Sequence, residues 1–229
     1  MIGVVVPAHN EAALVIDCID AVVAAARHPD LGGEPVEIVV VLDACSDGTA
    51  DIVASMPVSA IEVQVRNVGA ARAQGAMRLL ERGARWLAFT DADTQVAPDW
   101  LVQQLQLDAE VVCGTVAVND WSEHAPHERR MEEHFRATYS DADGHRHVHG
   151  ANLGISAAAY RLVGGFSALA SSEDVALVQA LQAAGVQVAW SAAPRVYTSA
   201  RRRARAPSGF AAALCAAAEA FAIPAMAVK

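Results

Sequence analysis

Apolar residues in the first half of the chain follow two alternating patterns. Short continuous runs rich in valine, isoleucine and alanine are typical of strands buried on both faces, and the stretches between them have the spacing of helices. Strands are predicted at residues 2–6, 37–42, 60–65 and 85–90, and helices at residues 11–26, 48–56, 69–82 and 98–106. The first strand is expected to end at Pro7, because proline cannot donate to a sheet. The alternation predicts an α/β fold with a mostly parallel central sheet covered on both faces.

The second half is less regular. The predicted order is a strand at residues 111–118, a charged helix at 123–135, a polar loop at 141–149, a segment at 150–156, a helix from 157, an acidic turn at 172–174 with a helix to about 184, and a strand at 186–190. No internal repeat and no linker composition interrupts this order. We therefore expect residues 1–229 to form a single domain.

Composition and charge exclude several classes of protein. Hydrophobic residues make up 54 % of the chain and charged residues 19 %, which is a globular composition. The formal net charge of −9 argues against a nucleic-acid partner, since such proteins usually present a basic face to phosphates. The four cysteines are scattered and form no CxxC pair, so neither a zinc knuckle nor a disulfide framework is indicated. The first residues read as a strand and not as a signal peptide, and a cytoplasmic protein is expected.

The apolar stretch at residues 210–228 allows two interpretations. Glu219 and Pro224 interrupt it, and it barely reaches the ~20 residues that a membrane span needs. A terminal helix packed on the domain is favoured. The alternative is a helix that lies at a membrane surface, as in a peripheral protein, or contacts a partner.

Polar side chains follow the predicted strands. Asn10, Asp43, Asp47, Asp91 and Asp93 all stand just after a strand. Ligands of open parallel sheets bind at the carboxyl ends of the strands. We therefore expect these side chains to meet at one edge of the sheet.

Asp91 and Asp93 place two carboxylates one residue apart after the fourth strand. A hard cation such as Mg²⁺ or Mn²⁺ takes oxygen ligands and is commonly shared between carboxylates and substrate phosphates. The same pair also occurs by chance in turns. A phosphatase signature would need threonine where Gln95 stands, and Asp93 lies too far from Pro98 to cap the helix that opens there.

The loops after the first two strands carry the candidate nucleotide contacts. Residues 7–12 have neither the glycine pattern of a dinucleotide fold nor a P-loop, which removes the usual support for hydride transfer and ATP hydrolysis. In the next loop, residues 42–49, a carboxylate can accept a hydrogen bond from a nucleotide base or a ribose. A turn with a helix cap explains Asp47 equally well but leaves Asp43 unexplained.

Taken together, these motifs resemble family 2 glycosyltransferases of the GT-A fold, a Rossmann-like α/β/α sandwich. The matching segments, in chain order, are residues 7–12, 43–49, 67–72, 91–93, 150–156 and 172–174. Each segment is loose by itself, whereas the series in order is specific for the superfamily and uninformative about the substrate. The resemblance covers residues 2–190.

The resemblance implies a role for each matching position. Residues 1–110 would form a nucleotide-binding half, residues 111–200 an acceptor-binding half, and residues 201–229 a basic segment with an apolar helix. The implied nucleotide-binding residues are Pro7, Ala8, His9, Asn10, Glu11, Asp43, Arg72, Asp91 and Ala92. The implied metal ligands are Asp93, directly, and Asp91; the implied acceptor wall is His149, Gly150, Ala151 and Asn152. Asp174 would be the general base, with Glu173 beside it, although an acidic pair at a helix N-terminus also suits the helix dipole.

The chain departs from the family pattern after the late strand. Family members often supply a histidine there as a third metal ligand, and residues 194–201 contain none. The metal then has fewer protein ligands, or Thr198 or Ser199 lies in that place. The arginines at 201–203 and 205 could bind a diphosphate, or they could form a solvated basic segment or contact an anionic membrane.

Three histidines, His145, His147 and His149, alternate along the polar loop. In an extended chain their imidazoles would share one face and could bind a transition metal. We favour an acceptor-site loop in which His149 contacts the substrate.

The sequence thus predicts an inverting, metal-dependent transferase that uses a nucleoside-diphosphate sugar, with a UDP-sugar favoured over GDP- and dTDP-sugars. The acceptor is open among a small metabolite, a lipid carrier and a glycan. A sugar-phosphate nucleotidyltransferase is the first alternative, but it would want a glycine-rich basic segment after the first strand. A non-catalytic nucleotide-binding or assembly module is the second. The sequence leaves the oligomeric state open.

Overall fold

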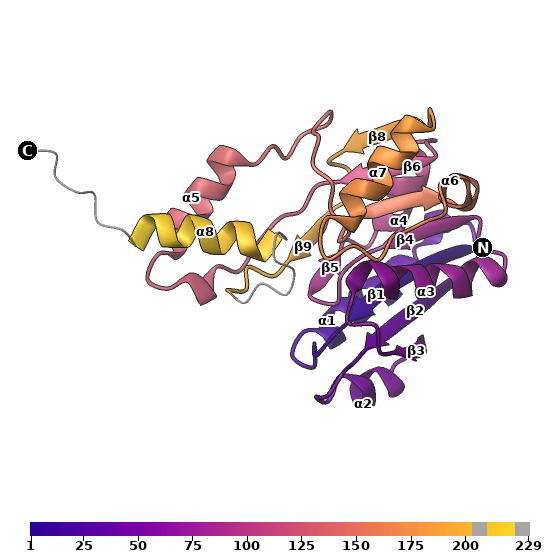
Figure 1. The fold of residues 1–229 in the computed structure, drawn as a ribbon, viewed down its shortest axis with the longest axis horizontal. Helices are drawn as coiled ribbons and strands as arrows, with labels where there is room; N and C mark the ends of the chain where they lie inside the picture. The colour runs from indigo at the N-terminus through magenta and orange to yellow at the C-terminus, as the bar shows by residue number, and fades with distance from the viewer. Residues whose placement is uncertain (203–209, 223–229) are drawn as a thin grey trace, which may run out of the picture.

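A computed structural model describes residues 1–202 and 210–222, with side chains of the last helix described to residue 219. Its centre is a seven-stranded sheet in the order β3-β2-β1-β4-β7-β6-β8 (Figure 1). The strands of this sheet are β1 (Ile2–Ala8), β2 (Val36–Asp43), β3 (Ser59–Val63), β4 (Trp86–Phe89), β6 (Val111–Gly114), β7 (Leu153–Ser156) and β8 (Val188–Ser191). Only β7 runs antiparallel to its neighbours, so the predicted mostly parallel sheet is confirmed.

Helices cover both faces of the sheet. One face packs against α1 (Val15–Ala26), α2 (Thr49–Ala54) and α4 (Trp100–Gln106). The other face packs against α3 (Val68–Glu81), α6 (Ala157–Leu162) and α7 (Glu173–Ala183). Alternate residues of β1 supply the two cores, as the period of a strand requires: Val4 and Val6 belong to the first, and Val5 to the second. The predicted three-layer α/β/α sandwich is confirmed.

Pro7 does not end the first strand, contrary to the sequence prediction. It lies within β1, paired with Val41 of β2. Pairing of β1 with β4 stops at Val5, whose carbonyl accepts the N–H of Thr90. Pro7 has the same strand parity as Val5, so its missing N–H falls on the side where β4 no longer pairs, and no ladder bond is lost.

A separate group of elements projects from the sandwich. The predicted helix at 123–135 is instead a short 3₁₀ turn (Ser122–His124) and α5 (Glu128–Thr138), with Pro126 between them. Helix α8 (Phe210–Ala222) packs on α5 through a small core that includes Trp121, Met131 and Leu214. We call α5 and α8 the helical lobe; Figure 1 shows it extending away from the sheet.

A two-stranded sheet absent from the sequence prediction joins the lobe to the body. Strand β5 (Thr94–Val96) pairs antiparallel with β9 (Val196–Thr198), and Thr94 faces Thr198. Because β5 follows β4 in the chain, this pairing holds the segment after β9 next to the carboxyl end of β4. Across the described part of the chain, none of the helices is both long and apolar enough to pass through a membrane.

Gly75 sets how closely α3 approaches the sheet. A Cβ at this position would lie 2.6 Å from Val5 Cγ1 and 2.9 Å from Val41 Cγ2. Gly75→Ala should therefore lower the free energy of unfolding by ~1–2 kcal/mol, because the overpacking outweighs the helix propensity that alanine gains. Urea unfolding measures this difference. The control is Gln74→Ala on the exposed side of the same helix, which should leave stability unchanged or slightly raised; an equal effect of both changes would contradict the packing argument.

Candidate active site

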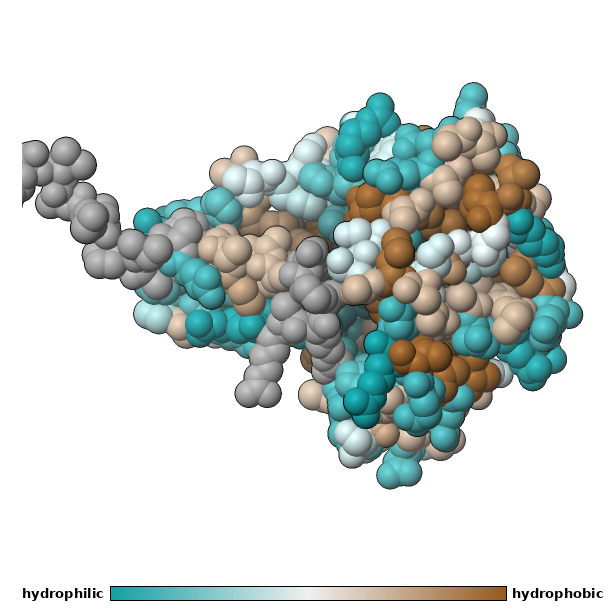
Figure 2. Space-filling model, in the orientation of Figure 1, coloured by the Kyte–Doolittle hydropathy of each residue, from teal (hydrophilic) through white to brown (hydrophobic). Residues whose placement is uncertain are grey.

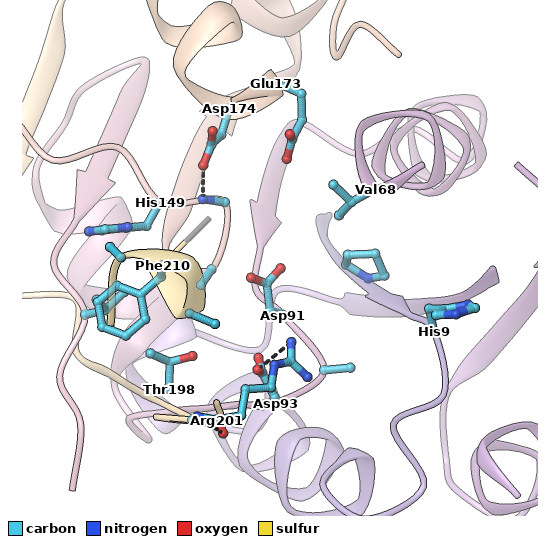
Figure 3. A pocket seen from close by; sticks show the side chains of 18 of the residues that line it. His9, Val68, Asp91, Asp93, His149, Glu173, Asp174, Thr198, Arg201 and Phe210 are labelled. Carbon is cyan, nitrogen blue, oxygen red and sulfur yellow. Dashed lines mark hydrogen bonds and ion pairs between the residues drawn. The ribbon is translucent and has the colours of Figure 1, made fainter. Parts of the chain in front are cut away.

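A cavity of about 1080 Å³ opens at the carboxyl ends of β1, β2 and β4, between the sandwich and the helical lobe. Every residue to which the family resemblance gave a nucleotide, metal, acceptor or catalytic role lines it except Asn152. In Figure 3, Asp91 lies at the centre, with Asp174 and Glu173 on one side and Asp93 on the other. The expectation that strand-end polar residues converge holds for Asn10, Asp43, Asp91 and Asp93, whereas Asp47 lies outside the lining.

A buried arginine joins the two acidic parts of the cavity. Arg72, on α3, has a side chain that is only 4 % exposed and binds two carboxylates. Its Nη2 lies 2.5 Å from Asp91 Oδ1 after β4, and its Nη1 donates to Glu173 at the start of α7. Burial raises the pKa of the Glu173 carboxyl group, although Arg72 opposes that effect. Removing one member of a buried ion pair leaves an uncompensated charge, so these residues act as a unit.

Gly150 leaves room for this arginine. A Cβ at Gly150 would lie 2.3–2.5 Å from atoms of the Arg72 guanidinium. The backbone at Gly150 thus packs directly on the arginine. Its N–H points at the next carboxylate, since it donates to Asp174 Oδ2 at 2.7 Å.

Asp174 stands in the first turn of α7 and lines the cavity. Its Oδ1 accepts the N–H of Val175 at 2.8 Å while its Oδ2 accepts from Gly150. These two bonds fix the orientation of the carboxylate and leave it further lone pairs toward the cavity. Glu173, in contrast, is buried and bound to Arg72. Of the two acidic residues, Asp174 is the one placed to accept a proton from a bound molecule.

Asp93 is paired with an arginine from beyond β9. Arg201 Nη2 lies 2.8 Å from Asp93 Oδ2, and its Nη1 donates to Glu11 Oε1 at 2.8 Å. Burial raises the pKa of the Asp93 carboxyl group to about 6, and the charge of Arg201 opposes this. The β5–β9 pairing brings Arg201 next to Asp93. A hydrogen bond of 2.9 Å between the hydroxyls of Thr94 and Thr198 links the two strands beside this ion pair.

The loops at the nucleotide end are held by carboxylates. Asp43 is buried and accepts three backbone N–H groups, from residues 65, 66 and 67, at 2.8–2.9 Å. His9 Nδ1 lies 2.6 Å from the Asp43 carbonyl oxygen. Asp47 accepts from Ala12 and Thr49, so it fixes the loop and the start of α2 instead of facing the cavity. The Asp43 side chain therefore shapes the pocket by holding residues 65–67, whatever else it contacts.

Strained backbone conformations are concentrated in the residues that line the cavity. Five described residues other than glycine have positive φ, and four of them line the cavity: Asn10, Ala44, Arg66 and Ser172. Each such conformation costs about 1–3 kcal/mol, and strain of this kind concentrates at functional sites.

Asn152 does not belong to the acceptor wall. It is fully buried, and its Oδ1 accepts from the indole N–H of Trp100 at 2.8 Å. Its Nδ2 donates to the carbonyl groups of Thr115 and Pro194. A side-chain amide with these bonds ties β6 and β7 to the chain before β9, which is a structural role.

An aromatic wall, which the sequence did not predict, forms the side of the cavity next to Asp174. Tyr139 stacks on Phe135 at 4.7 Å and on His147 at 4.2 Å between ring centroids, and Phe210 of α8 meets Phe135 and His149 edge-on. Burial, helped by His147 and His145, lowers the pKa of His149 to about 4. His149 and His147 face the cavity, as the predicted acceptor loop requires, but His145 is buried and directed at Ser191. The histidine loop gave one signal for this wall in the sequence, and the spacing of Phe135 and Tyr139 at the end of α5 was the signal that was not used.

The fold and the carboxylate-lined cavity define an α/β protein of the GT-A type. The family model for glycosyl transferase family 2 matches residues 3–163, so the chain belongs to this family and the resemblance inferred from its motifs is confirmed. None of the curated proteins matches the sequence.

Solved structures share the fold at low identity. TarS from S. aureus, residues 1–349 in complex with UDP-GlcNAc, has a TM-score of 0.62 and 16 % identity, covering 91 % of this chain and 61 % of that one. The mannosyltransferase PcManGT from Pyrobaculum calidifontis, in complex with GDP-Man and Mn²⁺, has a TM-score of 0.62 and 19 % identity over 89 % and 58 %. GalNAc-T7, with UDP, GalNAc and Mn²⁺, has a TM-score of 0.63 and 15 % identity over 86 % and 43 %. The chain thus spans less than two thirds of the length of each of these proteins.

The depressed pKa of His149 makes stability depend on pH. Since this pKa falls from 6.5 to about 4 on folding, the unfolded chain binds more protons between these values. The free energy of unfolding should therefore decrease as the pH falls from about 7 to about 4, with His149 responsible for ~2–3 kcal/mol of the loss. His149→Gln, which keeps a hydrogen-bond partner for Tyr139, should flatten the curve in urea unfolding at several pH values. Parallel curves for both proteins would contradict the assignment.

Proposed function

We propose that the chain transfers a sugar from a nucleoside-diphosphate sugar, with a UDP-sugar favoured, to an acceptor hydroxyl with inversion at the anomeric carbon. The observation that carries the proposal is the single cavity in which Asp91 and Asp93 face the same space as Asp174, with Arg72 bridging the two sides. Inverting transfer needs a base on the acceptor side and charge stabilisation on the leaving-group side. Membership of family 2 supports this reaction type, and two of the structural neighbours named above contain a nucleotide sugar.

The nucleotide would occupy the end of the cavity lined by Pro7, Ala8, His9 and Asp43, and its diphosphate would extend toward Asp91. This placement uses residues 1–110 as the donor half and residues 111–200 as the acceptor half, as the sequence predicted. The three N–H bonds that Asp43 accepts hold residues 65–67 at the rim of the pocket.

The carboxylate oxygens of Asp91 and Asp93 are ligands of the kind that a hard divalent cation, Mg²⁺ or Mn²⁺, prefers. Asp91 and Asp93 would hold it; among residues 1–202 and 210–222, no group of three or more histidine, cysteine or acidic residues could bind a metal by itself. Cations of this kind are commonly held by one or two carboxylates together with substrate phosphates, which would complete the set. When bound, the cation supplies stabilisation of the negative charge on the leaving diphosphate. Two structural neighbours contain Mn²⁺.

The protein groups have separate tasks in this reaction. Asp174 would accept the proton of the acceptor hydroxyl, and Gly150 and Val175 hold its carboxylate in place. Glu173 would not accept the proton, since Arg72 binds it; it positions the arginine. Arg201, which neutralises Asp93 in this structure, would turn to the diphosphate as the negative charge arrives.

Thermal unfolding of the purified chain with UDP, GDP, dTDP and ADP, each with Mn²⁺ or with EDTA, tests the proposal. A nucleotide at a hundred times its dissociation constant stabilises the native state by about 2.7 kcal/mol. We expect a rise in melting temperature with UDP that requires Mn²⁺. If no nucleotide raises it under either condition, the chain is not a nucleotide-sugar transferase.

Asp174→Asn should separate binding from catalysis. The amide keeps the size of the side chain but cannot accept the proton, so transfer should fall by about 10²–10⁴-fold while the UDP-induced rise in melting temperature stays within error. Release of UDP from the donor sugar measures the first quantity. Glu110→Gln, a change at an exposed acidic residue away from the cavity, is the control. Normal turnover in Asp174→Asn would remove the base assignment.

Arg201→Gln should make Mn²⁺ bind more tightly in the absence of nucleotide. The arginine competes with the cation for Asp93, so its removal should lower the Mn²⁺ dissociation constant by about tenfold, which corresponds to ~1.4 kcal/mol. Electron paramagnetic resonance of free Mn²⁺ measures this constant. Arg195→Gln, which removes an exposed arginine paired with Asp141, should have no effect. Equal or weaker Mn²⁺ binding in Arg201→Gln would show that the cation does not bind at Asp93.

A further inference from the structure

The part of the cavity beyond the donor site has a different chemical character. In Figure 3, His9 and Val68 lie on one side of Asp91, and His149 and Phe210 lie on the other. The second side is formed by the helical lobe and the histidine loop, and we call it the lobe wall. Its lining residues are Val116, His134, Phe135, Thr138, Tyr139, His147, Val148, His149, Phe210, Ala211, Ala213, Leu214 and Ala217. In Figure 2, part of the region of α8 is drawn in the tan of moderately hydrophobic residues.

The two hydroxyl groups of the lobe wall bind other protein groups. The Tyr139 hydroxyl accepts the N–H of Val116 at 2.9 Å and lies within hydrogen-bond distance, 2.9 Å, of His149 Nε2. The Thr138 hydroxyl donates to the carbonyl of His134 at 2.8 Å. Because the pKa of His149 is depressed, its ring is neutral at pH 7. The hydroxyl groups of the wall are therefore bound to protein groups, and its remaining polar side chains are the rings of His134, His147 and His149.

Rigid packing keeps this wall in shape. Phe135, Tyr139 and His147 form a continuous stack, and Phe210 closes it edge-on. Aromatic groups arranged in this way offer a large apolar surface with little freedom to rearrange. Such a surface suits a hydrocarbon or an aromatic ring, since burial of apolar area is what it can stabilise.

The lobe wall is continuous with the candidate base. His149 directly precedes Gly150, whose N–H donates to Asp174 Oδ2. A hydroxyl that contacts Asp174 has His149 and Phe210 beside it, on the side of the cavity opposite His9.

We propose that the acceptor is an alcohol with an apolar body, of the prenyl or aryl class, and that the lobe wall binds this body. The inference rests on the proposed transferase function. In the reaction, the acceptor oxygen forms a bond to the anomeric carbon as the bond from that carbon to the phosphate oxygen breaks. The acceptor proton goes to Asp174, and the electron pair of the broken bond leaves with the nucleoside diphosphate. An alcohol of this kind is either a soluble molecule or a membrane lipid, and both present the same chemistry to the wall.

Binding of geraniol in the presence of UDP and Mn²⁺, followed by isothermal titration calorimetry, tests the wall directly. The test variant is Ala213→Asp, which places a carboxylate on exposed α8 surface that lines the cavity. The matched control is Ala216→Asp, an equally exposed alanine of the same helix outside the lining. Ala213→Asp should weaken geraniol binding by about tenfold or more, because the apolar body would desolvate the carboxylate, and Ala216→Asp should change it by less than about twofold.

Transfer assays then distinguish the sources of the alcohol. Geraniol and benzyl alcohol in solution form one arm, a long-chain polyprenol in phosphatidylglycerol vesicles the second, and glucose and glycerol the third. Transfer in the first arm identifies a soluble acceptor, and transfer in the second alone identifies a lipid; either result supports the proposal if Ala213→Asp reduces it. Transfer only to glucose or glycerol, or equal geraniol binding by the two aspartate variants, would overturn it.

The nucleotide measurement separates this inference from the function on which it rests. If UDP with Mn²⁺ stabilises the chain but geraniol fails to bind, the apolar acceptor is wrong and the transferase function stands. If geraniol binds with the expected dependence on Ala213 but no nucleotide binds, the transferase function fails.

Discussion

The site depends on one buried interaction, the contact of Arg72 with Asp91 and Glu173. The guanidinium is almost inaccessible to water, so its charge must be compensated within the protein, and the two carboxylates come from the end of β4 and the start of α7. Asp174 follows Glu173 in the chain, and Gly150 packs on the arginine while its N–H binds Asp174. The Arg72 guanidinium thereby fixes the distance between the side of the cavity that would hold the diphosphate and the side that would hold the acceptor.

A second ion pair has a different character. Arg201 reaches Asp93 from the segment after β9, and its side chain is 21 % exposed, compared with 4 % for Arg72. The pair between Arg72 and Asp91 is structural because breaking it leaves a charge in the interior. The pair between Arg201 and Asp93 lies at the cavity, where, in the proposed function, an incoming metal ion and a diphosphate would replace each partner. The proposed function thus combines a fixed frame with an exchangeable counter-ion, and the largely apolar lobe wall completes the cavity on the far side.

Much of this could be predicted from the sequence. Continuous apolar runs identify buried parallel strands, and the strand-end rule correctly gathered Asn10, Asp43, Asp91 and Asp93, because both depend on local pattern. The β5–β9 pair could not be predicted, since its strands are three residues long and about a hundred residues apart, and so the contact of Arg201 with Asp93 was missed. Asn152 was misjudged because its burial depends on Trp100, which is distant in sequence. The lobe wall was missed because α5 reads as a charged helix and its aromatic residues acquire meaning only against α8.

A crystal structure of the chain with UDP and Mn²⁺ is the decisive test of the proposed function. It should show Mn²⁺ between Asp93 and the diphosphate, Arg201 released from Asp93 and turned to a phosphate, and Arg72 still bound to Asp91 and Glu173. Asp174 should face the open space next to the lobe wall. A nucleotide bound elsewhere, or a Mn²⁺ ion held away from Asp91 and Asp93 while Arg201 keeps its place, would contradict it.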